Sequence, residues 1–134
     1  MEESMSHQAL NPPNFARAFS PYHQGVKCQP KNLIFVSGQV ALDEKGQVVG
    51  KGDVKAQTRQ VMENIIRVLR EGGASLREVV KVTVFLINMD HLKPVAEVRG
   101  EYFKDHLPAS TLVQVSSLVQ KELLVEIEAV AATN

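Results

Sequence analysis

Two strand-like runs near the C-terminal end constrain the fold of this chain more than any other feature of its sequence. Residues 107–131 read as a strand, a loop and a second strand. Alternate residues of a strand point to opposite faces of a sheet. In the second run, Leu123, Val125, Ile127 and Ala129 therefore share one face, and Leu124, Glu126, Glu128 and Val130 share the other. A carboxylate beside apolar neighbours needs a partner or a function, so we expect chemistry on the face that holds the two glutamates.

Helical periodicity predicts two helices upstream of these strands. Asp53 is a good N-cap residue and Gly72-Gly73 a good helix end. Between them a largely apolar stripe recurs at helical spacing, at Val54, Thr58, Val61, Met62, Ile65, Ile66 and Leu69. A second helix is predicted from about residue 91 to residue 104, with Pro94 in its first turn, where a missing N–H costs least.

Further strands are predicted for residues 17–26, 33–42 and 79–87, with a hairpin turn at residues 43–46 that returns onto residues 47–49. Gly38 is expected to mark a bulge or a close approach. The order strand-strand-strand-helix-strand-helix-strand-strand is typical of an α+β domain whose two helices cover only one face of the sheet. Because the other face is also apolar, we expect it to be buried against another copy of the chain.

Composition limits the classes of function. The 134 residues suit one compact domain, and the 15 basic and 15 acidic side chains cancel. This balance predicts no nucleic-acid partner and no membrane-surface partner, which leaves small molecules. Cys28 is the single cysteine, and without a secretory signal pattern or an apolar run near the ~20 residues of a membrane span we expect a cytoplasmic protein. Residues 1–14 are predicted to be a flexible leader and residues 15–134 a single domain.

Several short motifs follow one another in a specific order over most of the chain. They are PYHQ at residues 21–24, FVSGQ at residues 35–39, Gln57 in the first helix, VVKVTVFL from Val79, the pair Pro108-Ala109, and VEIEAVA from Val125. In this order and spacing the sequence resembles the Rid (YjgF) family of small enamine/imine deaminases. The resemblance implies a chorismate-mutase-like protomer with a mixed sheet of about six strands, assembled as a homotrimer with ligand sites in clefts between subunits. It also implies hydrolysis of a reactive enamine or imine to a keto acid and ammonia, without a cofactor or a metal.

The resemblance assigns roles to some residues. Glu126 matches the glutamate proposed to position or deprotonate the attacking water and is the expected catalytic residue. Tyr22 matches a tyrosine that lines the site, and Ser37-Gly38 match a loop that shapes it. His23 stands where the family tolerates small residues and is a candidate proton donor or replacement charge.

One substitution departs from the pattern of the deaminating subfamily. The motif PAR, whose arginine clamps the substrate carboxylate, reads PAS here, so that Ser110 stands at the arginine position and Leu112 follows where cysteine is frequent. Hydrogen bonds to charged groups contribute roughly 1.5–3 kcal/mol each. We therefore expect weak or no activity on the usual 2-imino acids, and either another substrate or a binding role.

Simpler interpretations stand beside these roles. Glu128 is interpreted as structural, Ser110 equally well as a turn residue, and His23 as a surface or interface residue. Arg99 is the nearest candidate in sequence for a substitute clamp, but a solvated helix arginine is the favoured interpretation. Two functions remain open: a homotrimeric enamine/imine hydrolase with Tyr22, His23, Ser37, Gly38 and Ser110 lining the cleft, and a non-catalytic small-molecule-binding or regulatory trimer.

Overall fold

The computed structural model describes residues 7–134; residues 1–6, which begin the predicted leader, lie outside the described part. The main sheet has four strands in the order β3-β6-β4-β5, and β1 and β2 form a separate two-stranded ribbon. The strands are β1 (Gln8–Leu10), β2 (Gly25–Lys27), β3 (Asn32–Gln39), β4 (Val79–Leu86), β5 (Ala109–Gln114) and β6 (Val125–Thr133), with helices α1 (Val54–Glu71) and α2 (Leu92–Phe103). Short 3-10 helices at Leu76–Glu78 and Met89–His91 precede β4 and α2. The predicted α+β class and the two helices are confirmed, and the mixed sheet results from the parallel pairing of β4 with β5.

The predicted helices form for the expected local reasons. The Asp53 carboxylate accepts a hydrogen bond from the Ala56 N–H at 3.0 Å, and Gly72 caps the other end of α1. Gly73 follows with a φ of 74°, which favours glycine. The α1 stripe packs onto the sheet through buried Val61, Met62, Ile65 and Leu69, among others.

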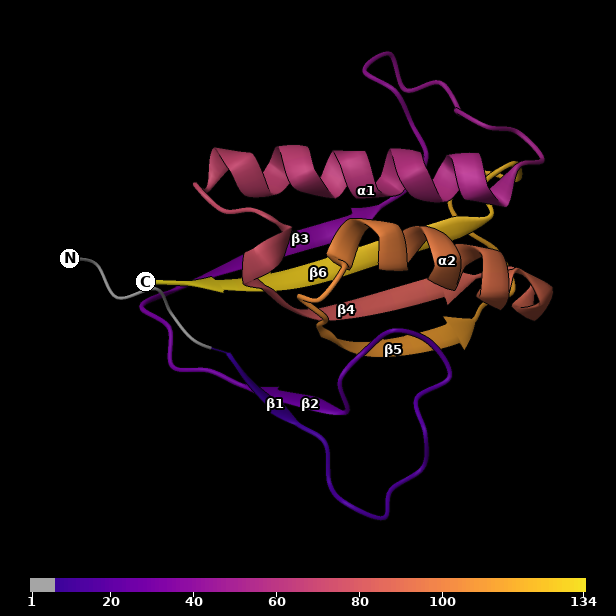
Figure 1. Cartoon of the computed structure of the whole chain (residues 1–134). Coiled ribbons are helices and arrows are strands. Elements are labelled where there is room, and N and C mark those ends of the chain that lie inside the picture. Colours follow the sequence, from indigo (N-terminus) through magenta and orange to yellow (C-terminus); the bar gives the residue numbers. More distant parts are fainter. Residues whose placement is uncertain (1–6) are drawn as a thin grey trace.

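Both helices lie on one side of the main sheet (Figure 1). On that side the central strands bury Val82, Val84 and Leu86 of β4 opposite Ala129, Ile127 and Val125 of β6. We call this side the helix face and the opposite side the open face. Glu126 and Glu128 belong to the open face, because they pair across the ladder with Phe85 and Thr83, the alternate residues of β4. The predicted sharing of one face by these glutamates is therefore confirmed.

The six strands are not the six expected, although their order along the chain is the same. Residues 8–10, inside the predicted leader, form β1, because their backbone groups pair with β2. Residues 17–24 are not a strand and instead form most of a long excursion between β1 and β2 (Figure 1). The expected hairpin at residues 43–49 is reduced to one bridge, between Leu42 and Val48. Its turn is closed by the Asp43 carboxylate, which accepts from the backbone N–H groups of Lys45 and Gln47.

Gln57 connects three separated parts of the chain from a fully buried position on α1. Its side-chain nitrogen donates to the carbonyls of Gly50 at 3.1 Å and Glu122 at 2.9 Å, and its oxygen accepts from the Leu124 N–H at 2.8 Å. The contacts hold the segment that enters β6 against the start of α1.

We expect Gln57→Ala to lower the free energy of unfolding by about 1–3 kcal/mol, because three backbone groups lose the hydrogen bonds that the buried Gln57 side chain makes to them. The matched control is Gln60→Ala on the same helix, whose side chain bonds only the Asn64 side chain. Chemical denaturation at fixed protein concentration compares the two variants. Equal effects of both substitutions would contradict the bridging role of Gln57.

Candidate functional site

Glu126 lies against a bulge in β3. The antiparallel register between β3 and β6 shifts between Val36 and Gln39, which places the bulge at Ser37 and Gly38 as expected from the sequence. A side chain at position 38 would collide with the Glu126 carboxylate, since an ideal Cβ there would lie 2.8 Å from its Cδ. Glycine at position 38 therefore leaves the space that the Glu126 side chain occupies.

Glu126 and Ser37 are available to a ligand. Glu126 is half-buried and Ser37 is exposed, and neither side chain forms a hydrogen bond or an ion pair with any other residue of the described chain. The polar residues gathered on the open face, Ser37 and Glu126 with Gly38 between them in space, are called the open-face group below.

A second cluster lies at the outer strand of the sheet, on the helix face. Ser110 is the second residue of β5 and pairs with Val82, whose side chain is buried under the helices. The Ser110 hydroxyl accepts a hydrogen bond of 3.0 Å from Nη2 of Arg99 on α2. Leu112, two residues further along, packs against the hydrophobic core. Ser110 is therefore next to a guanidinium group that comes from another element.

The interpretation of Arg99 as a solvated helix residue is wrong, because its side chain has 0% exposure. Arg99 lies on the apolar stripe of α2 with Val95 and Phe103, at helical spacing. Burial lowers the pKa of Arg99 to about 10, still well above neutral pH, so the charge is retained. The sequence contained the signal for this burial in the spacing of that stripe.

The segment that carries Tyr22 and His23 packs against α2 and the start of β5. The Pro21 ring lies 3.5 Å from the position of a Cβ at Gly100, the neighbour of Arg99. The His23 N–H donates to the Pro108 carbonyl at 3.0 Å, and His23 forms a parallel bridge with Ala109 at the start of β5. Tyr22, His23, Arg99 and Ser110 are called the edge group below.

Asn11 fixes the imidazole of His23. The side-chain oxygen Oδ1 of Asn11 accepts a hydrogen bond from the Gln24 N–H at 2.9 Å. This bond directs the side-chain nitrogen Nδ2 of Asn11 toward His23 Nδ1 at 3.1 Å. Since an amide nitrogen only donates, Nδ1 accepts, and in the neutral ring the proton is on Nε2. A residue of the predicted leader thus sets the tautomer of a candidate site residue.

The two groups are separated within one chain. One strand, β4, lies between β6 and β5, and Glu126 is three residues along β6 from Ala129, the residue level with Ser110. The standard spacings of strands and residues then place Glu126 and Ser110 roughly 14 Å apart. In addition, Glu126 faces the open side of the sheet, whereas Ser110 faces the helices. The structure joins Arg99 to Ser110 and His23 to the start of β5, but it does not bring the edge group to the open-face group.

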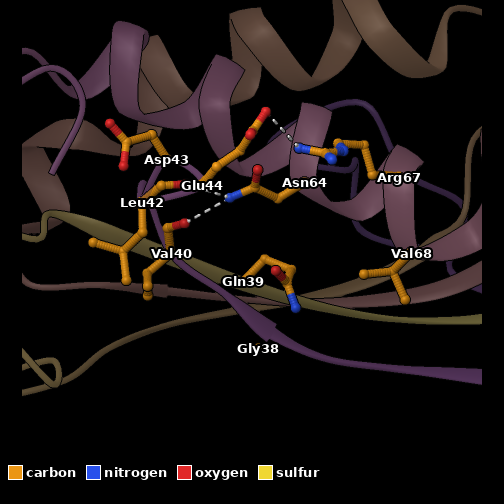
Figure 2. Close-up of a pocket in the computed structure, with 9 residues that line it drawn as sticks. All are labelled: Gly38, Gln39, Val40, Leu42, Asp43, Glu44, Asn64, Arg67 and Val68. Carbon is orange, nitrogen blue, oxygen red and sulfur yellow. Dashed lines mark hydrogen bonds and ion pairs between the residues drawn. The ribbon is translucent and has the colours of Figure 1, made fainter. Parts of the chain in front are cut away.

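An open pocket of about 430 Å³ lies beside Gly38, between the end of β3 and α1, and none of the other predicted site residues lines it. Figure 2 shows that Asn64, Arg67 and Glu44 are already engaged: Asn64 donates to the carbonyls of Val40 and Leu42, and Arg67 forms an ion pair with Glu44. Exposed ion pairs of this kind contribute little. The pocket is best explained as the place where α1 holds the loop that follows β3.

Residues 7–134 contain neither a metal-binding cluster nor a membrane-spanning helix. This part of the chain has no cluster of three or more His, Cys, Asp or Glu side chains with the arrangement of a metal site. None of its helices combines the length and the apolarity required to cross a membrane.

Similarity to known proteins agrees with the fold. The family model described as Endoribonuclease L-PSP matches residues 13–133. A RutC family protein of Pyrococcus horikoshii is 44% identical over 118 residues, which cover 88% of this chain and 91% of the relative. The 3-aminoacrylate deaminase RutC of Acinetobacter baylyi is 36% identical over 127 residues, covering 95% and 98%. A crystal structure of YyfB, a Rid family protein from Yersinia pestis, superposes with a TM-score of 0.87 at 30% identity, covering 94% and 98%.

The fold and the sequence together define a small α+β protomer with the YjgF type of architecture. The chain belongs to the endoribonuclease L-PSP family, which includes the Rid proteins.

We expect Gly38→Ala to destabilise the protein by about 1–3 kcal/mol, because the added methyl group meets the Glu126 carboxylate. Shortening the glutamate relieves that contact, so the double variant Gly38→Ala with Glu126→Ala should recover most of the loss. Urea unfolding of the two single variants and the double variant measures the coupling. Gly25→Ala serves as the control, since its nearest atom, Leu10 Cβ, would lie at an ordinary 3.4 Å. Additive effects at positions 38 and 126 would contradict the contact.

Proposed function

We propose that this protein is a cofactor-independent hydrolase of a reactive enamine or imine, with Glu126 as the general base. The observation that supports this most directly is the Glu126 carboxylate, half-buried on the open face and without a partner among the described residues. A side chain in that condition is free to hold a water molecule. The printed name of the Acinetobacter baylyi relative, 3-aminoacrylate deaminase, supports the same class of substrate.

The proposed chemistry uses only a bound water and proton transfers. Glu126 takes a proton from the water while the oxygen forms a bond to the carbon of the protonated C=N group. The tetrahedral intermediate keeps both the hydroxyl and the amino group, and Glu126 returns the proton to the nitrogen. Breakage of the C–N bond then releases ammonia, and loss of the hydroxyl proton leaves the keto acid. Positioning the water and the C=N carbon is the main contribution of the protein.

The proposed site is shared between subunits of a homotrimer. Within one chain the open-face group and the edge group point to opposite sides of the sheet, so neither alone surrounds a ligand. The open face also exposes large apolar side chains: Phe35 is 73% exposed and Leu33 is 52% exposed, both on β3. Burial of this face against other copies would remove the apolar surface from water. The same contact would allow the open-face group of one subunit to meet the edge group of the next.

A non-catalytic binding trimer is the alternative function. The separation of the two groups and the exposed open face fit it equally well, whereas the unpartnered carboxylate favours the enzyme. A nucleic-acid function, which the family description suggests, receives no support from a chain with 15 basic and 15 acidic residues.

Glu126→Gln should reduce the hydrolysis of 2-iminobutyrate by about 10²–10⁴-fold, the range for loss of a general base. The imine is generated in situ from an amino acid, and its decay is followed with and without protein. Glu128→Gln, two residues along the same strand and on the same face, is the matched control and should retain the rate. Absence of any acceleration by the wild-type chain, with the trimer intact, would favour the binding role.

A charge on the open face, at Phe35 of the outer strand β3, tests the assembly. Phe35→Asp should shift the molar mass measured by light scattering from a trimer to a monomer, because a carboxylate would be buried without a partner. Val68→Asp adds the same charge on α1, at a residue that is 38% exposed, and should remain trimeric. A monomeric wild-type protein at the assay concentration would contradict the shared site.

A further inference from the structure

Arg99 has more hydrogen-bonding capacity than the described chain satisfies. A guanidinium group has five N–H donors. Its Nη2 atom bonds Ser110, but Nε and Nη1 have no partner among residues 7–134, although the side chain has 0% exposure. Buried donors without a partner are rare in folded proteins and require an explanation.

The positive charge of Arg99 is also without a counter-charge in the described chain. The ion pairs of this part of the chain involve other residues, and burial is the one cause that shifts the pKa of Arg99. A buried charge with a single neutral hydrogen-bond partner is unfavourable unless an anion joins it. The arrangement is therefore complete only when an anion is bound.

We propose that Arg99 binds the carboxylate of a small 2-imino or 2-oxo acid at the edge of β5. This inference rests on the proposed function for the reacting part of the ligand, but it concerns a different residue and a different contact. The free donors of the guanidinium group are enough for two parallel hydrogen bonds to one carboxylate. The Ser110 hydroxyl accepts from Nη2 and has its own proton left to donate to the same anion.

The edge group provides the way in. The side chain of Arg99 is covered in the single chain, and the segment with Pro21, Tyr22 and His23 lies against Gly100 and Pro108, its neighbours in the fold. This segment belongs to the long excursion between β1 and β2 and is outside the main sheet. An acid that reaches Arg99 from this side of β5 is bordered by the segment with Tyr22 and His23.

A carboxylate of a neighbouring subunit is the competing partner for Arg99. A permanent ion pair with Glu126 of the neighbour would occupy the base that the proposed reaction needs, which favours the small acid. Arg99 also compensates for serine at position 110, where the deaminating subfamily has an arginine. Serine at that position does not leave the site without a positive charge, because the guanidinium of Arg99 reaches the same hydroxyl from α2.

The test is a binding experiment on the full chain that requires no turnover. Calorimetry compares 2-oxobutyrate with its neutral methyl ester. We expect the acid to bind at least about tenfold more tightly than the ester. Arg99→Leu should lower the affinity for the acid by at least about tenfold and leave the affinity for the ester unchanged. Arg70→Leu, an exposed arginine of α1, is the matched control and should bind the acid like the wild type.

A rescue separates a binding role from a structural one. Adding Ser110→Arg to Arg99→Leu returns a guanidinium group to the edge of β5 and should restore most of the affinity for the acid. Equal binding of acid and ester by the wild type, or acid binding that Arg99→Leu leaves intact, would overturn the inference and would be the outcome if a neighbouring carboxylate held Arg99. If Arg99→Leu does not fold, two other measurements test the inference: the ratio of the affinities of the wild type for the acid and the ester, and the change in affinity for the acid in Arg99→Lys. The binding measurement does not depend on turnover, so loss of acid binding in Arg99→Leu would support the role of Arg99 even if Glu126 were not needed for hydrolysis. The two proposals can therefore be contradicted separately.

Discussion

Two helices cover one face of a four-stranded sheet, and within the described chain the other face remains open. The position of Glu126 in the candidate site depends on this asymmetry. Strand alternation sends Val125, Ile127 and Ala129 into the core and leaves Glu126 on the uncovered side. One of the two central strands that form the core therefore also presents the carboxylate with the clearest potential for chemistry.

The sheet alone does not make the site. The open-face group is set by a bulge in β3, where Gly38 leaves room for the Glu126 side chain. The edge group depends on a different part of the fold, the packing of α2 against the start of β5. Since the two groups face opposite sides of one protomer, the proposed function requires contacts between protomers, and activity and assembly become a single physical problem.

Much of this architecture follows from local rules. The N-cap at Asp53, the glycines after α1 and the bulge at Gly38 were predictable, because each depends on neighbouring backbone geometry. The ribbon of β1 and β2 was not, since the pairing of Gln8 with Lys27 is decided by tertiary contacts rather than by periodicity. The environment of Arg99 was missed for another reason. A charged residue on an apolar stripe is normally assigned to solvent, although the helical spacing of Arg99 with Val95 and Phe103 indicates burial. The hydrogen bond of Arg99 to Ser110 of β5 depends on tertiary packing.

The hydrogen bonds of Asn11 place part of the N-terminal segment in contact with the edge group. Through one amide, a residue outside both the sheet and the helices determines which nitrogen of His23 holds the proton. The hydrogen-bonding pattern that His23 presents at the β5 margin is consequently adjustable by a change at position 11 alone. A substitution in this stretch leaves the core as it is, because Asn11 is exposed.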